Sequence, residues 1–302
     1  MPLDEINPKL WVVIPTYNRS LDLVACLDSL MSASINLEQV VIVDNHSQDD
    51  TIITVQNKFP STHLISLDEN LGATGAANIG FDFALEHGAD YVLRQDSDTI
   101  VDKNFIKPLI DVGESDPDIG IISPKIYYYE PPDEIWYAGV DSQPFIFGTT
   151  NEHRHEKDRP ENSQQREVDY IWAASMLIKS EVLRKTGGFD TDFFVYHEEI
   201  NFCERVKKLG YKLVFVPNTY VWHKVGSATN NAWTAYHWNR SKMLLYRKHA
   251  RNVMHLVFLI CYAFFYALWS AIANKKSGGN RGPFRNAIKG LLQGLTEKIS
   301  KA

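Results

Sequence analysis

Two acidic residues, Asp96 and Asp98, follow the apolar run Tyr91-Val92-Leu93 and are separated by one serine. Where a strand ends in a loop, carboxylates at positions i and i+2 can share one divalent cation. Hard cations take oxygen ligands and keep positions open for substrate phosphates. Alone, the pair is weak evidence, since acidic turn residues are abundant. It predicts a metal site only if other polar residues converge on the same place.

The first ninety residues alternate between short apolar runs and segments with helical spacing. The expected strands are 11–14, 40–43, 63–67 and 91–93. This order predicts an α/β domain with a doubly wound, Rossmann-like, mostly parallel sheet. Ligands bind such sheets at the carboxyl ends of the strands. The residues at those ends are Thr16, Asp44, Asn70 and Asp96.

Several motifs, in this order along the chain, resemble family 2 glycosyltransferases, the large inverting family with the GT-A fold. In the N-terminal half they are Val13-Ile14-Pro15-Thr16-Tyr17-Asn18-Arg19, Val43-Asp44-Asn45-His46-Ser47, Asn70-Leu71-Gly72, Asn78-Ile79-Gly80 and Asp96-Ser97-Asp98. Downstream they are Gly187-Gly188-Phe189-Asp190, the run from Phe193 to Glu199, Gly210-Tyr211 and Trp222-His223. The resemblance covers about residues 10 to 250, and Tyr246-Arg247-Lys248-His249 is most similar to bacterial rhamnosyltransferase-like members that build cell-surface polysaccharides.

The resemblance implies a catalytic domain over 1–250, with a donor half at about 1–125 and an acceptor half at about 126–250, followed by a helical tail over 251–302. It also implies a Mn²⁺ or Mg²⁺ ion. Asp98 is the expected direct ligand, Asp96 is expected to hold the ribose or the ion through water, and His223 matches a histidine that can complete the metal site. A cation there would stabilise the charge that develops on the leaving nucleoside diphosphate.

The family places an acidic pair, usually Glu-Asp, at the start of a helix beneath the sugar, and its second member is the general base. The matching residues are Glu198 and Glu199. We expect Glu199 to be the base and Glu198 to bind or orient the acceptor, but the departure from Glu-Asp leaves the reverse assignment open. Acids at a helix N-terminus also complement the helix dipole, a preference worth under about 1 kcal/mol.

The sequence gives weaker evidence for the residues that bind the nucleotide. Asp44 is expected to accept a hydrogen bond from the pyrimidine N3–H. Because uracil and thymine share this donor, the sequence does not distinguish a UDP-sugar from a dTDP-sugar. Gly72 and Asn78 are expected to let the backbone approach the diphosphate. The base pocket is expected to be lined by Pro15, Thr16 and Tyr17.

Polar residues dominate the segment 141–168, which is expected to form a mobile loop on the acceptor side. His153-Arg154-His155 resembles a metal-binding triplet, but no carboxylate has the spacing to complete it. Some aromatic residues near this loop are expected to stack on acceptor sugars and others to belong to the core. They are Tyr127 to Tyr129, Trp136, Tyr137 and Trp172.

Charge is distributed unevenly along the chain. Residues 240–302 contain twelve Lys or Arg and one acid, a net charge of +11, so that residues 1–239 carry −17 of the total of −6. A basic tail on an acidic body suggests an anionic membrane surface as its partner. The basic residues flank an apolar stretch, which favours lipid over nucleic acid.

That apolar stretch, 253–273, has no formal charge and approaches the roughly 20 residues that a spanning helix needs. Basic clusters on both sides argue against a single span. A polar stripe of His255, Tyr262, Tyr266 and Ser270 favours a helix in the membrane interface or a re-entrant helix, with a spanning helix and a buried helix as alternatives. A second amphipathic piece, 287–295, is expected to extend the docking surface.

Three cysteines, Cys26, Cys203 and Cys261, lack metal-ligand spacing, and the first two are expected to be buried thiols in a reducing compartment. The acidic start, with Asp4 and Glu5, does not resemble a secretory signal peptide. The expected location is the cytoplasmic face of the cell membrane, with peripheral or monotopic attachment.

These patterns predict an inverting glycosyltransferase. It would move a sugar from dTDP-rhamnose or a UDP-hexose to a hydroxyl of a growing, lipid-linked cell-surface polysaccharide. Linkage and oligomeric state stay open, with a homodimer among the possibilities. Two other classes are also considered: a nucleotidyltransferase, and a catalytically silent membrane-bound subunit that binds sugar nucleotides. The complete set of Asp96, Asp98 and Glu199 argues against the silent subunit.

Overall fold

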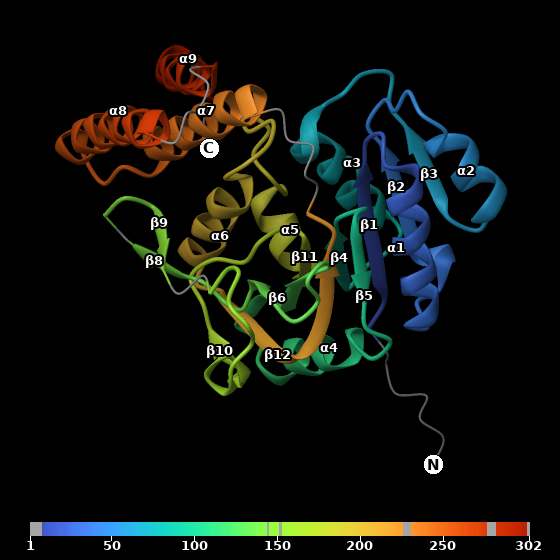
Figure 1. The fold of residues 1–302 in the computed structure, drawn as a ribbon. Coiled ribbons are helices and arrows are strands. Elements are labelled where there is room, and N and C mark those ends of the chain that lie inside the picture. Colours follow the sequence, from blue (N-terminus) through green and yellow to red (C-terminus); the bar gives the residue numbers. More distant parts are fainter. Residues whose placement is uncertain (1–7, 144, 151–152, 226–230, 277–281, 301–302) are drawn as a thin grey trace.

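The N-terminal half forms a parallel sheet with connecting helices (Figure 1). The computed structural model describes residues 8–300 except 144, 151–152, 226–230 and 277–281. The strands β1 (Leu10–Thr16), β2 (Val40–Asp44), β3 (His63–Ser66) and β4 (Tyr91–Gln95) pair in parallel in the order β4-β1-β2-β3. The connecting helices are α1 (Ser20–Ser32), α2 (Thr51–Lys58) and α3 (Gly72–Glu86), with the short 3-10 helix η1 (Leu37–Gln39). The predicted α/β class and parallel strands are confirmed.

The second half extends the same sheet to ten strands among the described residues. Strand β11 (Ser175–Lys179) is antiparallel to both β4 and β6 (Ile119–Tyr128), and β12 (Lys212–His223) is parallel to β6. Three short strands pair at the margins: β5 (Thr99–Val101) and β10 (Arg166–Glu167) with β12, and β7 (Ile135–Tyr137) with β6. The helices of this half are α4 (Ile106–Ser115), α5 (Ser180–Thr186) and α6 (Glu198–Lys208).

The core lies between this sheet and its helices. Strands β2 and β4 are buried along their whole length, as expected for parallel strands covered on both faces. Cys26 and Cys203 are fully buried, which confirms that part of the prediction, whereas Cys261 is exposed. Tyr137 is also fully buried and donates a hydrogen bond to the Tyr170 carbonyl at 3.1 Å, so it belongs to the core.

The segment 141–168 is more regular than the single loop predicted for it. It contains a hairpin of β8 (Asp141–Gln143) and β9 (Gly148–Thr150), the 3-10 helix η2 (Pro160–Ser163) and strand β10. The motion predicted for this segment stays a prediction.

Three helices form a layer beside the sheet domain: α7 (Asn231–His249), α8 (Val253–Lys276) and α9 (Gly282–Thr296) (Figure 1). Helix α9 packs so closely on α7 that a Cβ on Gly290 or Gly294 would overlap the carbonyl oxygens of Tyr236 and Arg240. Arg247 donates to the carbonyls of Gly294 and Glu297 at 2.7 and 2.9 Å and caps the end of α9. The basic tail is therefore partly used inside the protein.

The expectation that 287–295 extends a docking surface is wrong for most of its apolar residues. Ala287 and Leu291 are buried, and Ile288 and Leu295 pack against a cluster formed with α7 and α8. Leu292 is 49% exposed. Packing on α7 takes precedence because the two glycines of α9 allow the close approach.

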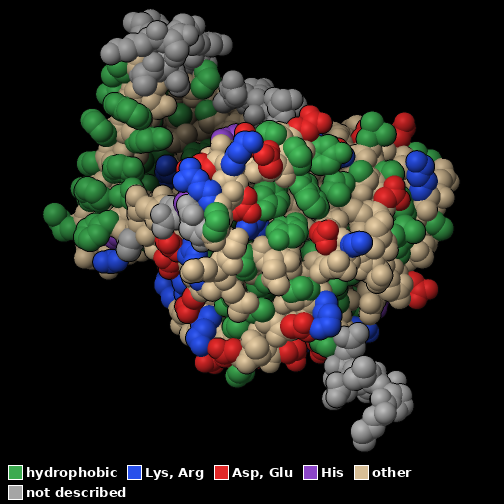
Figure 2. All heavy atoms as spheres, turned by 60° about the horizontal axis from the view of Figure 1, so that its bottom comes forward, with side chains coloured by type: hydrophobic (Ala, Val, Ile, Leu, Met, Phe, Trp, Pro, Cys, Tyr) green, Lys and Arg blue, Asp and Glu red, His purple; other side chains and the backbone are tan. Residues whose placement is uncertain are grey.

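Helix α8 is one continuous helix whose length and composition would allow it to cross a membrane. Its inward stripe is His255, Leu259, Ala263 and Ala267. His255 is buried and lies within 2.8 Å of the Phe145 carbonyl, whereas Tyr266 is 46% exposed, so the members of the predicted polar stripe differ in their exposure. Figure 2 shows hydrophobic side chains gathered over α8. The large exposed ones are Val253, Met254, Val257, Phe258, Phe265, Tyr266, Leu268, Trp269 and Ile272. This exposure contradicts the buried-helix alternative.

Candidate active site

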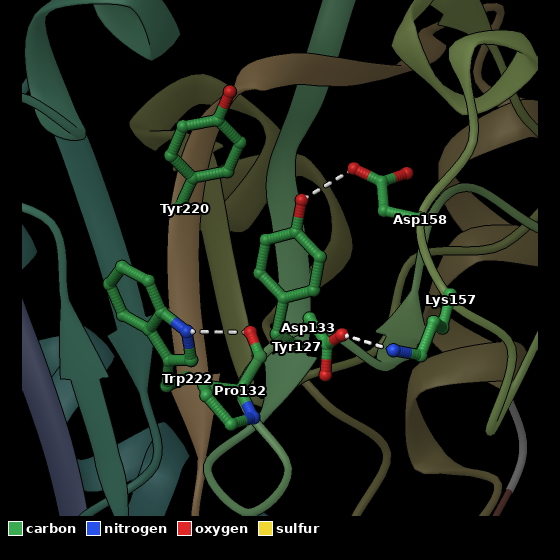
Figure 3. Close-up of a pocket in the computed structure, with 7 residues that line it drawn as sticks. All are labelled: Tyr127, Pro132, Asp133, Lys157, Asp158, Tyr220 and Trp222. Carbon is green, nitrogen blue, oxygen red and sulfur yellow. Dashed lines mark hydrogen bonds and ion pairs between the residues drawn. The ribbon is translucent and has the colours of Figure 1, made fainter.

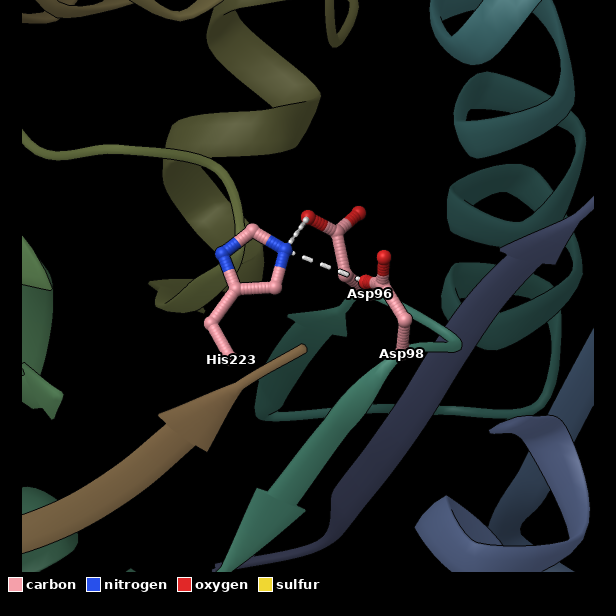
Figure 4. A group of neighbouring side chains, drawn as sticks. All are labelled: Asp96, Asp98 and His223. Atoms are coloured by element: carbon pink, nitrogen blue, oxygen red, sulfur yellow. Dashed lines mark hydrogen bonds and ion pairs between the residues drawn. The ribbon is translucent and has the colours of Figure 1, made fainter. Parts of the chain in front are cut away.

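Strand pairing brings Asp96 and Asp98 against His223 (Figure 4). Strand β5 starts directly after Asp98 and pairs with the end of β12, so that Thr99 lies opposite His223. The His223 Nε2 atom lies 3.1 Å from an Asp98 carboxylate oxygen and 3.8 Å from an Asp96 oxygen. The three predicted metal residues, from positions 125 residues apart, therefore lie together.

The donor set suits a hard divalent cation. One oxygen from each carboxylate and one imidazole nitrogen lie within 4.8 Å of one another. Mn²⁺ and Mg²⁺ accept carboxylate oxygens, and neutral imidazole is a common additional ligand. Asp98, Asp96 and His223 are accordingly the residues that would hold such an ion.

Hydrogen bonds fix the turn that carries the two aspartates. Gln95 is fully buried and donates to the Thr99 hydroxyl at 2.5 Å, and the Ser175 hydroxyl donates to Gln95 at 2.8 Å. The Thr99 hydroxyl in turn contacts the Asp96 carbonyl at 2.6 Å. A ligand turn that is held in this way loses little entropy when it binds an ion.

Arg94 is a site residue that the sequence analysis missed. It is 4% exposed, its guanidinium contacts the Asp96 carboxylate, and it donates to the Ala173 carbonyl at 2.5 Å. Burial of Asp96 opposes ionisation, but Arg94 and His223 hold the pKa of this carboxyl below its ordinary value. The available signal was an arginine directly after the apolar run Tyr91-Val92-Leu93, at a position that is still part of the buried strand β4.

Further cations border the same carboxylates. The Arg19 guanidinium lies 3.8 Å from Asp98 and 3.0 Å from Asp22, and the Lys224 ammonium lies 3.3 Å from Asp22. Guanidinium groups suit phosphate oxygens because they offer paired donors. The edge of the sheet therefore presents both a metal-ligand set and cations to a diphosphate.

Thr16 and Asp44 lie side by side at the ends of β1 and β2. Asp44 is fully buried, and one of its oxygens accepts the Ser47 backbone N–H at 2.9 Å. The other Asp44 oxygen and the Thr16 hydroxyl have no partner among the described residues. A buried polar atom without a partner is costly, so this pair of atoms is suited to a ligand's donor and acceptor. Tyr17, beside them, is 46% exposed.

The predicted diphosphate residues Gly72 and Asn78 have contacts inside the protein. The Asn78 side-chain amide donates to the Phe189 carbonyl and accepts from the Phe189 N–H, both at 2.8 Å. A Cβ on Gly72, whose φ is +75°, would overlap the Phe194 carbonyl oxygen. Both residues thus hold the 188–194 segment against α3. Their contact with a diphosphate stays a prediction.

Glu198 and Glu199 begin helix α6 after two residues, Tyr196 and His197, with left-handed φ values of 65° and 63°. Non-glycine residues in this region cluster at functional sites. One carboxylate oxygen of each glutamate is buried without a partner among the described residues. Burial, then the neighbouring Glu199, raises the pKa of Glu198 well above its ordinary value. Burial also raises the pKa of Glu199, against the opposing effect of Arg94.

Helix α7 packs against the loop that precedes this acidic pair. The Trp238 ring lies 4.4 Å from the His197 ring and 5.4 Å from the Tyr196 ring. The Ser241 hydroxyl donates to the Val195 carbonyl at 2.8 Å. Burial lowers the pKa of His197 to about 3, so it is neutral near pH 7. The sequence assigned no such support to α7.

On the acceptor side, aromatic side chains adjoin the metal-ligand group. The Trp136 ring lies edge-on to His223 at 4.6 Å. The Arg154 guanidinium lies 5.2 Å from the Trp136 ring and 5.8 Å from the Trp172 ring, and it also lowers the pKa of Glu199. Arg154 is therefore the member of the His153-Arg154-His155 triplet that reaches the site.

The Glu198→Gln variant is expected to be more stable than the wild type, with a difference that grows with pH. A carboxyl whose pKa is raised by folding binds its proton more tightly in the folded state. Stability therefore falls as pH rises from the ordinary value through the raised one. Glutamine avoids this cost because it stays neutral. Thermal unfolding in EDTA from about pH 5 to about pH 9 measures the effect; a difference that shrinks toward high pH would contradict it.

Comparison with known proteins shows similarity to glycosyltransferases over most of the chain. Residues 11–187 match the family model described as Glycosyl transferase family 2. An N-acetylglucosaminyl-diphospho-decaprenol L-rhamnosyltransferase of Mycobacterium tuberculosis is 26% identical over 242 residues, covering 72% of this chain and 76% of that protein. The dTDP-rhamnosyl transferase RfbF of Shigella flexneri is 25% identical over 230 residues, covering 73% of this chain and 71% of that protein.

Two solved structures share the architecture. The crystal structure of GalNAc-T7 with UDP, GalNAc and Mn²⁺ has a TM-score of 0.64 at 15% identity, covering 93% of this chain and 54% of that one. The mannosyltransferase PcManGT from Pyrobaculum calidifontis, in complex with GDP-Man and Mn²⁺, has a TM-score of 0.58 at 16% identity, covering 96% of this chain and 87% of that one. These similarities confirm the GT-A fold. Because the family model covers more than half of the chain, this protein belongs to glycosyltransferase family 2.

Proposed function

We propose that this enzyme transfers a sugar, with inversion, from a nucleoside-diphosphate sugar to a hydroxyl group of a glycan. The observation that carries the proposal is the meeting of Asp96, Asp98 and His223 at 3.1–3.8 Å, with Arg94 acting on both Asp96 and the buried glutamates. A metal-ligand set and a pair of carboxyls with raised pKa values at one sheet edge are what such a transfer requires.

Each group has a distinct part in the proposed reaction. The free oxygen of Asp44 accepts the N3–H of a uracil or thymine base. Asp98 and His223, with Asp96, hold a Mn²⁺ or Mg²⁺ ion. When bound, this ion neutralises charge on the diphosphate leaving group. Arg19 lies within 3.8 Å of Asp98 and adds positive charge at the diphosphate position.

Glu199 takes the proton from the acceptor hydroxyl while its oxygen attacks the anomeric carbon from the face opposite the diphosphate. A base is most effective when its pKa lies near the working pH, and burial moves the pKa of Glu199 in that direction. Glu198 holds the acceptor. Like-charged neighbours in a buried position do not both ionise readily, so the proton can be shared by the pair.

Rhamnose is the proposed donor sugar, carried by dTDP, with a UDP-hexose as the alternative. Support comes from two relatives that are named as rhamnosyltransferases, one of them for a decaprenol-linked acceptor. The proposed acceptor is accordingly a lipid-linked glycan of a cell-surface polysaccharide. No observation favours a nucleotidyltransferase or a catalytically silent subunit.

A donor panel tests this function. Hydrolysis of dTDP-rhamnose, UDP-glucose, UDP-GlcNAc and GDP-mannose is measured with Mn²⁺, with Mg²⁺ and with EDTA. We expect turnover of a dTDP- or UDP-sugar that needs a divalent ion, because Asp96, Asp98 and His223 would hold the ion that neutralises the diphosphate. Hydrolysis of no donor, or equal hydrolysis in EDTA, would contradict the proposal.

The exposed face of α8 is proposed to bind the cytoplasmic leaflet of the cell membrane, where a lipid-linked acceptor would be presented. Nine large apolar side chains on α8 are at least 46% exposed, and Phe145 beside the helix is 66% exposed. The two basic residues of α9, Arg285 and Lys289, are exposed and would face anionic lipids.

Replacing both Phe265 and Trp269 with glutamate is expected to reduce binding to phosphatidylglycerol vesicles at least tenfold, because each apolar side chain contributes about 1.5–3 kcal/mol when fully buried. Vesicle co-flotation measures binding. Ile53→Glu, on α2 and 52% exposed in the wild type, is the matched control and should bind normally. Equal binding by all three proteins would contradict the membrane proposal. A dimer that dissociates only in the double variant would instead assign the face to self-association.

A further inference from the structure

A pocket of about 380 Å³ lies away from the metal-ligand group, on β6 and β12 (Figure 3). This volume falls in the roughly 300–1,000 Å³ range of small-ligand sites. Its lining consists of three aromatic side chains, one proline and three charged residues. They are Tyr127, Tyr220, Trp222, Pro132, Asp133, Lys157 and Asp158.

The pocket opens on the sheet face opposite the metal-ligand group. Successive side chains of a strand point to opposite faces, so Tyr220 and Trp222 share one face of β12 while His223 points to the other. The parallel register places Tyr127 of β6 beside Trp222. Because Trp222 adjoins His223 in the chain, the pocket and the metal-ligand group lie on two faces of the same strand end.

The aromatic rings form a continuous platform. The Tyr127 ring is 6.3 Å from Trp222, at an interplanar angle of 27°, and 5.8 Å from Tyr220, at 36°. Rings with exposed π faces attract the weakly positive C–H groups that line one face of a pyranose. The platform is held in place, since the Tyr127 hydroxyl donates to Asp158 at 2.6 Å and the Trp222 N–H donates to the Pro132 carbonyl at 3.2 Å.

Charges at the pocket are compensated in pairs. The ammonium of Lys157 lies 3.0 Å from Asp133, and that of the buried Lys125 lies 2.8 Å from Asp158. A phosphate would therefore compete with one carboxylate for each of the two cations. A neutral ligand with many hydroxyls can use carboxylate acceptors and the ammonium donor together without adding charge.

We propose that this pocket binds a neutral pyranose residue of the glycan chain, at a second site behind the catalytic face. This inference rests on the proposed function, which supplies a glycan acceptor. A glycan that passes around the end of β12 would place one sugar unit on the Tyr127-Tyr220-Trp222 platform. The growing end of the glycan would then lie near His223. The platform would thus favour oligosaccharides over single sugars.

Saturation-transfer NMR on the full chain, with maltohexaose, cellohexaose and a rhamnose-containing oligosaccharide as probes, tests the proposal. We expect at least one probe to bind. Trp222→Ala and Tyr220→Ala should each weaken binding by about tenfold, and Trp222→Phe should retain most of it because a ring remains. Trp269→Ala, which removes a tryptophan 56% exposed on α8, is the matched control and should bind normally.

Donor hydrolysis separates this proposal from the proposed function, because the pocket touches none of the donor residues. It should stay within about twofold of the wild type in Tyr220→Ala, whereas KM for an oligosaccharide acceptor rises about tenfold and KM for a monosaccharide acceptor does not. Binding of no probe, or binding by Trp222→Ala and Tyr220→Ala that is as tight as binding by the wild type, would overturn the second site even if donor hydrolysis is normal.

Discussion

Asp98→Ala is expected to lower nucleotide-sugar turnover by about 10³-fold or more, the largest effect of any single substitution proposed for this enzyme. Asp98 faces His223 at 3.1 Å, and the loss of its carboxylate removes a ligand without removing core volume. Stabilisation of leaving-group charge is worth several kcal/mol, and about 1.4 kcal/mol corresponds to a factor of ten in rate. Steady-state hydrolysis of the best donor in saturating Mn²⁺ measures the effect.

The fold should survive this substitution. The turn is held by Gln95, Thr99 and Ser175, and none of these bonds uses the Asp98 side chain. The melting temperature of Asp98→Ala in EDTA should therefore match that of the wild type or exceed it. Asp111→Ala, which breaks only an exposed ion pair with Lys107, is the control and should retain full turnover. Full activity of Asp98→Ala in EDTA would show that the metal assignment is wrong.

Glu199→Gln is expected to reduce sugar transfer by about 100-fold or more while donor binding survives. Glutamine keeps the size and hydrogen bonding of glutamate but cannot take a proton, and loss of a general base typically costs about 10²–10⁴-fold. Titration calorimetry with dTDP or UDP and Mn²⁺ measures the binding, and acceptor turnover measures the rate. Glu198→Gln should reduce the rate less.

The pH dependence of the transfer rate is a second test of Glu199 as the general base. Because burial raises the pKa of Glu199, transfer by the wild type should decline as pH falls through this raised value. In Glu199→Gln the residual rate should lose this acidic limb. A larger loss in Glu198→Gln than in Glu199→Gln would move the base to Glu198, which the Glu-Glu sequence allows.

Local signals explain which parts of the fold and site could be predicted. Strands β1, β2 and β4 are short apolar runs that end in polar residues, so their parallel order and their common edge follow from the pattern. Asp98 and Glu199 were found because motifs mark them. His223 needed the resemblance, since only the pairing of β5 with β12 brings it from 125 residues away.

Other features depend on packing that no local pattern specifies. Arg94 looks like an interruption of a buried strand, yet it joins Asp96 to the Ala173 carbonyl. The apolar face of α9 resembles a docking surface, but Gly290 and Gly294 let it close on α7. His255 of α8 turns inward because the Phe145 carbonyl offers it a partner. In each case a residue distant in sequence decides the outcome.

The most direct test of the account is a crystal structure with Mn²⁺ and dTDP or UDP, using anomalous scattering to locate the ion. We predict one anomalous peak in contact with Asp98 and His223, with the diphosphate on the same ion and the pyrimidine N3–H directed at Asp44. An ion bound elsewhere with this set of side chains left unchanged, or a nucleotide that binds away from Thr16 and Asp44, would contradict the account.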